Sequence, residues 1–193
     1  KKIIGVEKRG AFMNLALEGN AEIVAVEEKM LREIAARYDA LDTGNIYGAE
    51  KPRFPGTDAD TLVYIGDAAA CRAPELARAF CSVLTKLGVP FRTLDEEPSS
   101  GADLYDLMGG VDEVKAVCAA LAARIAGTGV RTVVCLNPND AAMMARRWAD
   151  FGVTLPAQVV TATSFVAERL KNASVSPAPL GVRATYHDNV RLS

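Results

Sequence analysis

Residues 61–67 have the sequence TLVYIGD, a short apolar run that ends at a glycine and an acidic residue. A brief, unbroken apolar run beside turn-forming residues is typical of a strand that is buried on both faces of a sheet. Pro74 then lies in the first turn of a predicted helix, whose apolar residues recur at helical spacing until Gly88 ends it. Because a helix follows the strand, the stretch predicts the first unit of a parallel α/β sheet.

The alternation of strands and helices continues along the chain. We expect further strands at 91–94, 131–136, 158–161 and 182–186, and helices at 104–108, 112–126, 138–151 and 163–170. Residues 172–181 are rich in proline and serine and predict a linker before the last strand. Together these elements predict one α/β domain over residues 61–193, a parallel sheet of flavodoxin-like or Rossmann-like type with helices on both faces.

Two segments of different character precede this domain. Residues 1–41 are predicted to be helical: Asn20 is a suitable N-cap, and apolar residues from Ile23 to Ile34 recur at three- and four-residue spacing. This stripe of Met, Ile and Leu either packs against the chain's own sheet or provides a docking surface, and both interpretations stay open. Residues 42–60 contain repeated glycine and proline and predict an irregular connector.

The composition argues against several classes of function. The 193 residues include 22 Lys and Arg against 24 Asp and Glu, so no excess of basic charge is present to neutralise the phosphates of nucleic acids or anionic membranes. No apolar run approaches the ~20 residues of a membrane span, and the N-terminus lacks the apolar core of a signal peptide. Four cysteines without a CxxC pair are not a disulfide framework, so a cytoplasmic location is expected.

Polar residues gather after the predicted strands, where functional sites of parallel sheets form. These positions hold Asp67, Ser99, Ser100, Gly101, Asn137, Asp140, His187 and Asp188. The simplest interpretation is that Asp67, Asn137 and Asp140 cap helix N-termini, where the helix dipole favours a carboxylate. A second interpretation is that their oxygens, with Asp188, converge on a hard cation.

Three other kinds of site receive little support. The loop at 66–72 lacks the glycine pattern of a nucleotide-binding loop. His187 is the only histidine, and no serine near a strand end has the setting of a hydrolase nucleophile. Cys71 and Cys135 lie near strand ends and form a candidate redox pair, although no motif joins them.

One spaced set of residues is more specific. Asp67 is followed after 31 residues by Ser99-Ser100-Gly101, and after 35 more by Asn137-Pro138-Asn139-Asp140. This spacing resembles the signature of the cysteine-rich CCG domain, which is Cys, thirty-odd residues, Cys-Cys-Gly, about thirty-five residues, Cys-x-x-Cys. Residues 186–192, YHDNVRL, resemble the family's Tyr-His-Asp-Pro-Cys-His-Leu segment, with Val190 at the cysteine. Over residues 40–192 the chain is similar to the heterodisulfide reductase catalytic-subunit family.

The resemblance implies a fold and a redox setting, but not the family's chemistry. In the family, the cysteines bind iron–sulfur clusters, and related subunits occur in glycolate oxidase and lactate-utilisation complexes. Here the matched positions carry Asp67, Ser99, Ser100, Asn137, Asp140 and Val190. Iron–sulfur clusters rely on thiolates, whereas these replacements supply oxygen or no ligand at all, so we expect no cluster and no other cofactor or metal.

The sequence therefore predicts a cluster-free subunit of a heterodisulfide-reductase-like redox complex, which docks or scaffolds electron-carrying partner subunits. Two alternatives remain. In the first, the chain is an oxidoreductase subunit that still carries electrons or thiol–disulfide chemistry, through Cys71 and Cys135 or its partners. In the second, the vacated pocket binds a small molecule or metal through Asp67, Ser99, Asn137, Asp140 and His187, with Asp188 and Gly101 beside them.

Overall fold

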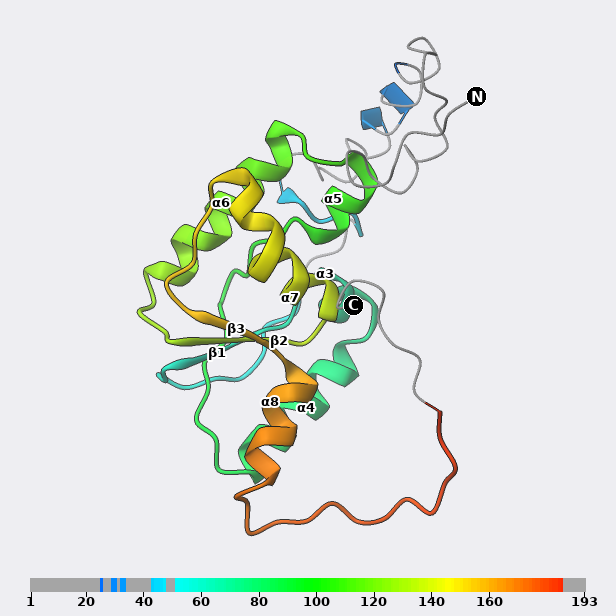
Figure 1. The fold of residues 1–193 in the computed structure, drawn as a ribbon, viewed down its shortest axis with the longest axis vertical. Coiled ribbons are helices and arrows are strands. Elements are labelled where there is room, and N and C mark those ends of the chain that lie inside the picture. The colour runs from blue at the N-terminus through cyan, green and yellow to red at the C-terminus, as the bar shows by residue number, and fades with distance from the viewer. Residues whose placement is uncertain (1–24, 26–28, 31, 34–42, 48–50, 186–193) are drawn as a thin grey trace.

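The structure is a computed structural model, and it describes residues 25, 29–30, 32–33, 43–47 and 51–185. In chain order the elements are β1 (Thr61–Tyr64), α3 (Asp67–Arg72), α4 (Pro74–Lys86), α5 (Ala102–Met108), α6 (Asp112–Ala126), β2 (Thr132–Cys135), α7 (Pro138–Ala142), the π-helical turn η3 (Met143–Arg147), the 3-10 turn η4 (Trp148–Phe151), β3 (Gln158–Thr161) and α8 (Ala162–Leu170) (Figure 1).

The three strands form one parallel sheet in the order β1-β2-β3. Their register aligns Thr61 with Thr132, and Thr132 with Gln158, so the strands begin and end together. The strands predicted at 61–65, 131–136 and 158–161 are thereby confirmed, and the molecule has the α/β arrangement expected from its alternating pattern.

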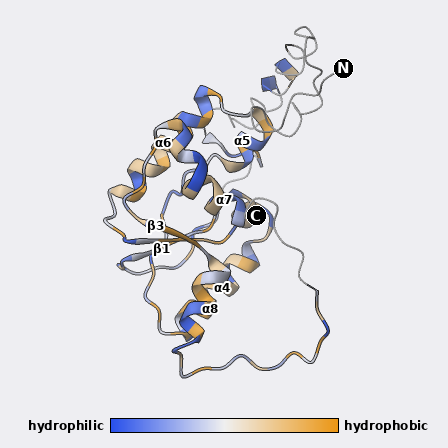
Figure 2. Ribbon diagram, in the orientation of Figure 1, coloured by the Kyte–Doolittle hydropathy of each residue, from blue (hydrophilic) through white to orange (hydrophobic). Residues whose placement is uncertain are grey.

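Helices cover both faces of the sheet. Because side chains alternate along a strand, Leu62 and Tyr64 face one layer, whereas Val63 and Ile65 face the other. The first layer is completed by α5, α6, η3 and η4, and the second by α3, α4 and α8. Figure 1 shows α5, α6 and α7 above the sheet and α4 and α8 below it. Colouring by hydropathy shows both hydrophobic and hydrophilic residues along these helices, as expected for helices that cover a core (Figure 2).

Two predicted strands are wrong for the residues that the structure describes. Residues 91–94 run beside β1, but only Arg92 forms a bridge, through its N–H to Thr61 O (2.9 Å) and its carbonyl to Val63 N (2.8 Å). Pro90 has no N–H to extend the ladder on one side. Residues 182–185 belong to no strand and are exposed to solvent, while Tyr186 lies outside the described residues.

Two predicted helical regions also differ. Residues 67–72, predicted as a loop, form α3, because Gly66 makes the turn at φ 80° and an alanine-rich helix follows. The helix predicted at 138–151 is divided into α7, η3 and η4. The wider π turn precedes Trp148, which is buried and donates its indole N–H to Ser100 O (3.1 Å). The division of the helix therefore accompanies the burial of its largest side chain.

Most of the predicted N-terminal helix lies outside the described residues. Ala25, Lys29, Met30, Arg32 and Glu33 are helical, and Arg32 pairs with Glu113 at the start of α6 (2.5 Å). Residues 44–47 and 51–60 form neither helix nor strand. No helix within the described residues is long and apolar enough to cross a membrane.

Candidate functional site

The carboxyl end of the sheet brings together residues that are far apart in the sequence. β1 leads through Gly66 into Asp67, β2 leads into Asp140 on α7, and the loop after Arg92 leads into Ser99 and Ser100 before α5. Within the described ranges, the buried polar or charged residues are Asp67, Ser99, Ser100 and Asp140, each exposed to 3% or less. All four stand at positions that the resemblance assigns to cluster-binding cysteines.

The two serines connect three segments around this point. Ser100 Oγ donates a hydrogen bond to Asp140 Oδ1 and accepts one from Ala102 N (3.1 Å) at the start of α5. Ser99 Oγ donates to Gly44 O (3.2 Å) in the connector and accepts from Gly101 N (3.1 Å). The hydroxyl groups thus fasten α5 to α7 and to the connector.

Lys51 supplies the positive charge of the site from the connector. Its ammonium lies 2.5 Å from Asp67 Oδ1 and 3.4 Å from Glu97 Oε1, and it donates to Glu97 O (2.9 Å). Glu97 also accepts hydrogen bonds from Ile65 N (2.8 Å) and Gly66 N (2.9 Å) at the end of β1. The Lys51 side chain is only 14% exposed, so this ion pair lies largely out of water.

Burial and the surplus of negative charge in the site together shift the pKa values of its ionisable groups. Burial raises the pKa of Asp140 well above its ordinary value, as do the nearby charges of Asp67, Asp103 and Glu97, and the Ser100 hydrogen bond only partly opposes them. Burial also raises the pKa of Glu97 against the pull of Lys51. Burial alone would lower the pKa of Lys51, but Glu97 and Asp67 outweigh it and raise that pKa.

Two buried carboxylate oxygens of the site have no hydrogen bond, and only one of them lies against a cation. Asp140 Oδ2 is buried and has no partner, whereas Asp67 Oδ1, which also lacks a bond of good geometry, lies against the Lys51 ammonium. Asp140 Oδ2 is directed at Gly66, because a Cβ placed on that glycine would overlap it. The raised pKa of Asp140 means that this burial favours the neutral form of its carboxyl group.

The helix-capping interpretation is right for one of the three residues. Asn137 precedes α7, and its side chain accepts a hydrogen bond from Asn139 N (3.0 Å). Asp67 is the first residue of α3 and makes no capping bond, since Gly66 is in the cap position. Asp140 lies inside α7 and bonds to Ser100 instead. Asp67 and Asp140 therefore make no side-chain cap, although both lie in the first turn of their helices, where the dipole favours a carboxylate.

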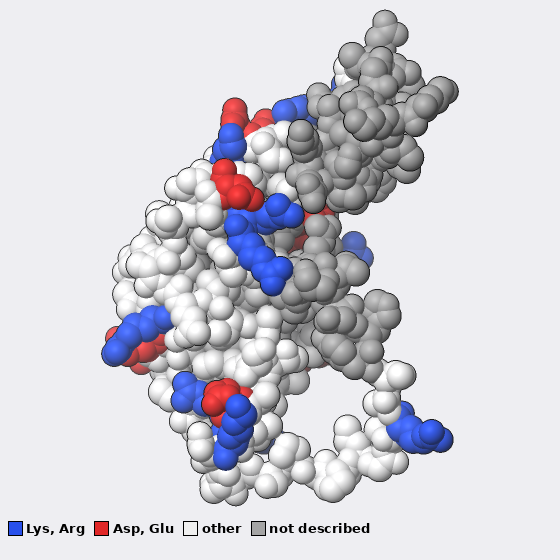
Figure 3. All heavy atoms as spheres, in the orientation of Figure 1, with Lys and Arg blue, Asp and Glu red and all other residues white. Residues whose placement is uncertain are grey.

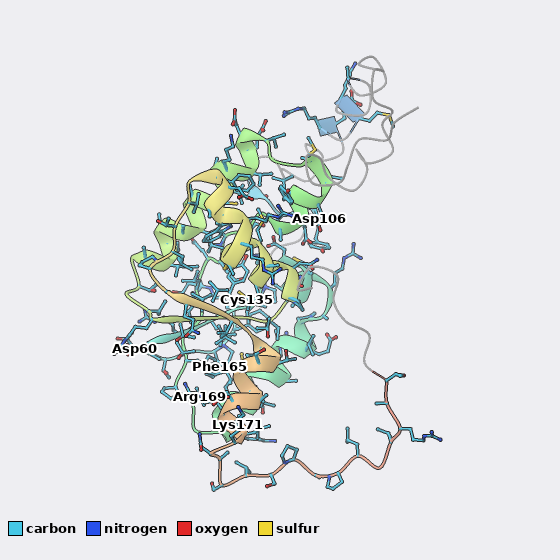
Figure 4. The ribbon with its side chains drawn as sticks, viewed as in Figure 1. Asp60, Asp106, Cys135, Phe165, Arg169 and Lys171 are labelled. Atoms are coloured by element: carbon cyan, nitrogen blue, oxygen red, sulfur yellow. The ribbon has the colours of Figure 1, made fainter. Side chains whose placement is uncertain are left out.

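The two candidate redox thiols lie in different surroundings, and no disulfide is formed. Cys71 is half-buried at the end of α3, 3.9 Å from Asn45 Nδ2. Cys135 is buried at the end of β2 and lies 3.7 Å from Met144 Sδ (Figure 4). Burial raises the pKa of both thiols, which disfavours the reactive thiolate. His187, Asp188 and Val190 lie outside the described residues.

Sequence reasoning did not single out Lys51 or Glu97. Lys51 stands in a connector without regular structure, where no periodicity places a side chain. Glu97 follows two other acidic residues, Asp95 and Glu96, which are both exposed, so nothing in the sequence distinguishes the buried one. A pocket of about 520 Å³ opens on Lys51, Asp67 and Glu97, with Arg53 and Arg124 also in its wall.

The donor set does not suit an iron–sulfur cluster. The matched positions within the described residues offer hydroxyl, amide and carboxyl groups, and a cationic ammonium lies among them. Within the same part of the chain, no group of three or more His, Cys, Asp or Glu side chains is arranged to hold a metal ion.

No protein-family model, curated protein or solved structure matches this chain.

Proposed function

We propose that residues 61–193 are a CCG-type domain, flavodoxin-like or Rossmann-like in origin, whose cluster site has been replaced by a network of charged and hydroxyl side chains. Its function is to dock or scaffold the electron-carrying subunits of a heterodisulfide-reductase-like complex in the cytoplasm. The observation that carries this proposal is the convergence of Asp67, Ser99, Ser100 and Asp140, which are separated by up to 73 positions, at one buried place.

The convergence supports the resemblance because the spacing was taken from the sequence alone. Residues at the carboxyl ends of neighbouring strands approach one another in any parallel sheet, but Asp and Ser are mostly exposed in proteins, so it is their joint burial that supports the resemblance. Here they are the buried polar residues of the described chain.

The replacement chemistry supports the loss of the cluster. A cluster bound by thiolates would hold the strand ends together. In this chain, direct ion pairs and hydrogen bonds between side chains hold them together. Lys51 joins Asp67 to Glu97, and Ser100 joins α5 to Asp140 on α7. These side-chain contacts therefore stabilise the fold in the absence of a cluster. A partner subunit would then bind to the surface of the domain. The raised pKa values of Cys71 and Cys135 give no support to thiol–disulfide chemistry.

The first experiment measures iron and acid-labile sulfide, with the visible spectrum, on protein purified without oxygen. We expect neither iron nor sulfide and no charge-transfer absorption. Stoichiometric iron and sulfide in the wild-type protein would contradict the cluster-free proposal.

A second experiment tests the family assignment by restoring the ligands. The restored variant carries Asp67→Cys, Ser99→Cys, Ser100→Cys, Asn137→Cys, Asp140→Cys and Lys51→Ala, and it is incubated with iron and sulfide under anaerobic conditions. A control variant receives cysteines at exposed positions, Ser82→Cys and Ser164→Cys. We expect cluster absorption in the restored variant alone. If the restored variant keeps its helical circular dichroism yet binds no more iron than the control, the positions are not cluster positions.

The docking role has its own test. The tagged protein, co-expressed with its genomic neighbours and purified without oxygen, is expected to elute with an iron–sulfur subunit, seen as visible absorption at the mass of a complex. Elution without any iron-containing partner from a strain that expresses such a complex would count against docking.

A further inference from the structure

Strand β3 leaves one side of the sheet open. It pairs with β2 on one side, and no described residue pairs with it on the other. Its residues Val159, Val160 and Thr161 are only half-buried, and the strand carries no charged side chain. Proteins usually protect such an edge with charges, proline or a covering segment, because its unpaired backbone groups can accept another strand.

The chain carries a segment that matches this edge. Residues 174–185 form neither helix nor strand, and Leu180 and Val182 are 85% and 69% exposed. From Val182 to Thr185 the side chains alternate between small or apolar residues and polar ones, which is the strand pattern. Figures 1 and 3 show the segment arching away from the domain, with open space between them.

We propose that residues 182–185 of one molecule add to β3 of a second copy, and that the exchange is reciprocal. Each copy of the chain carries both the open β3 edge and a segment able to pair with it. Two copies related by a twofold axis can therefore each pair their segment with the β3 edge of the other. Pro177 and Pro179 favour an extended backbone in the intervening linker, which holds the strand away from its own sheet. This proposal is independent of the cluster site, which lies at the carboxyl end of the strands.

Light scattering after size exclusion tests the association. We expect the wild-type protein at twice the 20.5 kDa mass of the chain. Ala184→Pro and Thr185→Pro each remove one backbone N–H, and the N–H groups of neighbouring strand residues point to opposite sides of the strand. The variant that loses the N–H facing β3 is therefore expected to be a monomer. Ala178→Pro, in the linker between two existing prolines, is the matched control and should remain dimeric. A wild-type monomer at every concentration, or a dimer that both proline variants leave intact, would overturn the proposal.

Disulfide trapping distinguishes two cases, in which residues 182–185 pair either with β3 of a second copy or with β3 of their own chain. In a Cys71→Ser background, Gln158→Cys is combined either with Val182→Cys or with Thr185→Cys, which favour parallel and antiparallel pairing respectively. Oxidation is expected to yield a covalent dimer in one of the two. A disulfide within a single chain would show that the segment pairs with its own β3, and no disulfide in either variant would show that it does not pair with β3 at all. Either result refutes the exchange.

Discussion

At the scale of single residues, Asp140 is the group with the clearest thermodynamic consequence. Its pKa is raised in the folded state, so the folded protein holds this proton more tightly than the unfolded chain does. Protonation of Asp140 therefore favours folding below the pKa of an unfolded Asp, about 3.9, and this contribution is lost as the pH rises through the folded pKa.

The prediction is that the free energy of unfolding of the wild-type protein falls, as the pH rises from about 4, relative to that of Asp140→Asn. The amide keeps an acceptor for Ser100 and cannot titrate, so the variant lacks this component. Urea unfolding at a series of pH values measures the difference, in which the titrations common to both proteins cancel. Parallel stability curves for the two proteins would mean that Asp140 does not change its proton affinity on folding.

Lys51 gives the second prediction at this scale. Lys51→Met leaves Asp67 and Glu97 buried without their cation, and breaking a buried pair in this way costs about 3–5 kcal/mol of stability. The control is Lys115→Met, which removes an exposed partner of Asp112 and should change stability little. Chemical denaturation compares the two. Equal effects of both substitutions would mean that the connector lysine is no more than a surface charge.

Among the site residues, those next to a predicted strand or helix could be predicted, and those in irregular segments could not. Asp67, Ser100 and Asp140 lie next to strands or helices whose periodicity fixes their place. Lys51 and Glu97 reach the site from segments without regular structure, where only tertiary packing decides which charged side chain is buried.

At the scale of elements, helices and strands were predicted correctly where the apolar spacing is regular. The prediction failed where a single tertiary contact determines the local structure. The helix at 74–86 and the strands at 132–135 and 158–161 follow from their apolar spacing. The division of 138–151 accompanies the hydrogen bond from Trp148 to the Ser100 carbonyl, which is a contact with a residue 48 positions away that local periodicity does not reveal. Residues 91–94 have a strand composition, but they pair with β1 only at Arg92.

The junction between β1 and α3 yields a prediction about Gly66. Its φ of 80° disfavours any residue with a Cβ, and a Cβ there would also overlap Asp140 Oδ2. Gly88 has a similar φ of 64° but open space around it. Gly88→Ala is expected to cost only the backbone penalty of about 1–2 kcal/mol, and Gly66→Ala more than that.

Thermal or urea unfolding of both alanine variants measures the difference. In an Asp140→Ala background the overlapping oxygen is absent, so adding Gly66→Ala should lower the stability of that variant only by the backbone penalty. If the two glycine substitutions cost the same, the close approach of Asp140 to the β1–α3 turn is wrong.

At the scale of the whole molecule, the sheet separates two apolar layers that are built from different helices. Leu84 of α4 belongs to the layer with α3 and α8, and Ile125 of α6 belongs to the layer with α5 and η4. Both side chains are almost fully buried. Because they lie in different layers, the two side chains are packed among different residues. Charged side chains, in contrast, lie in small groups of both signs on the face shown in Figure 3.

The last prediction follows from this separation. Leu84→Ala is expected to cost about 2–5 kcal/mol and Ile125→Val about 0.5–1.5 kcal/mol, because each removes buried methyl groups. Since the strands stand between the two sites, the double variant should lose the sum of the two costs to within about 0.5 kcal/mol. Urea unfolding of the three variants and the wild type gives the interaction energy directly. A larger interaction energy would show that the two layers are packed as one core, and that the sheet transmits a change on one face to the other.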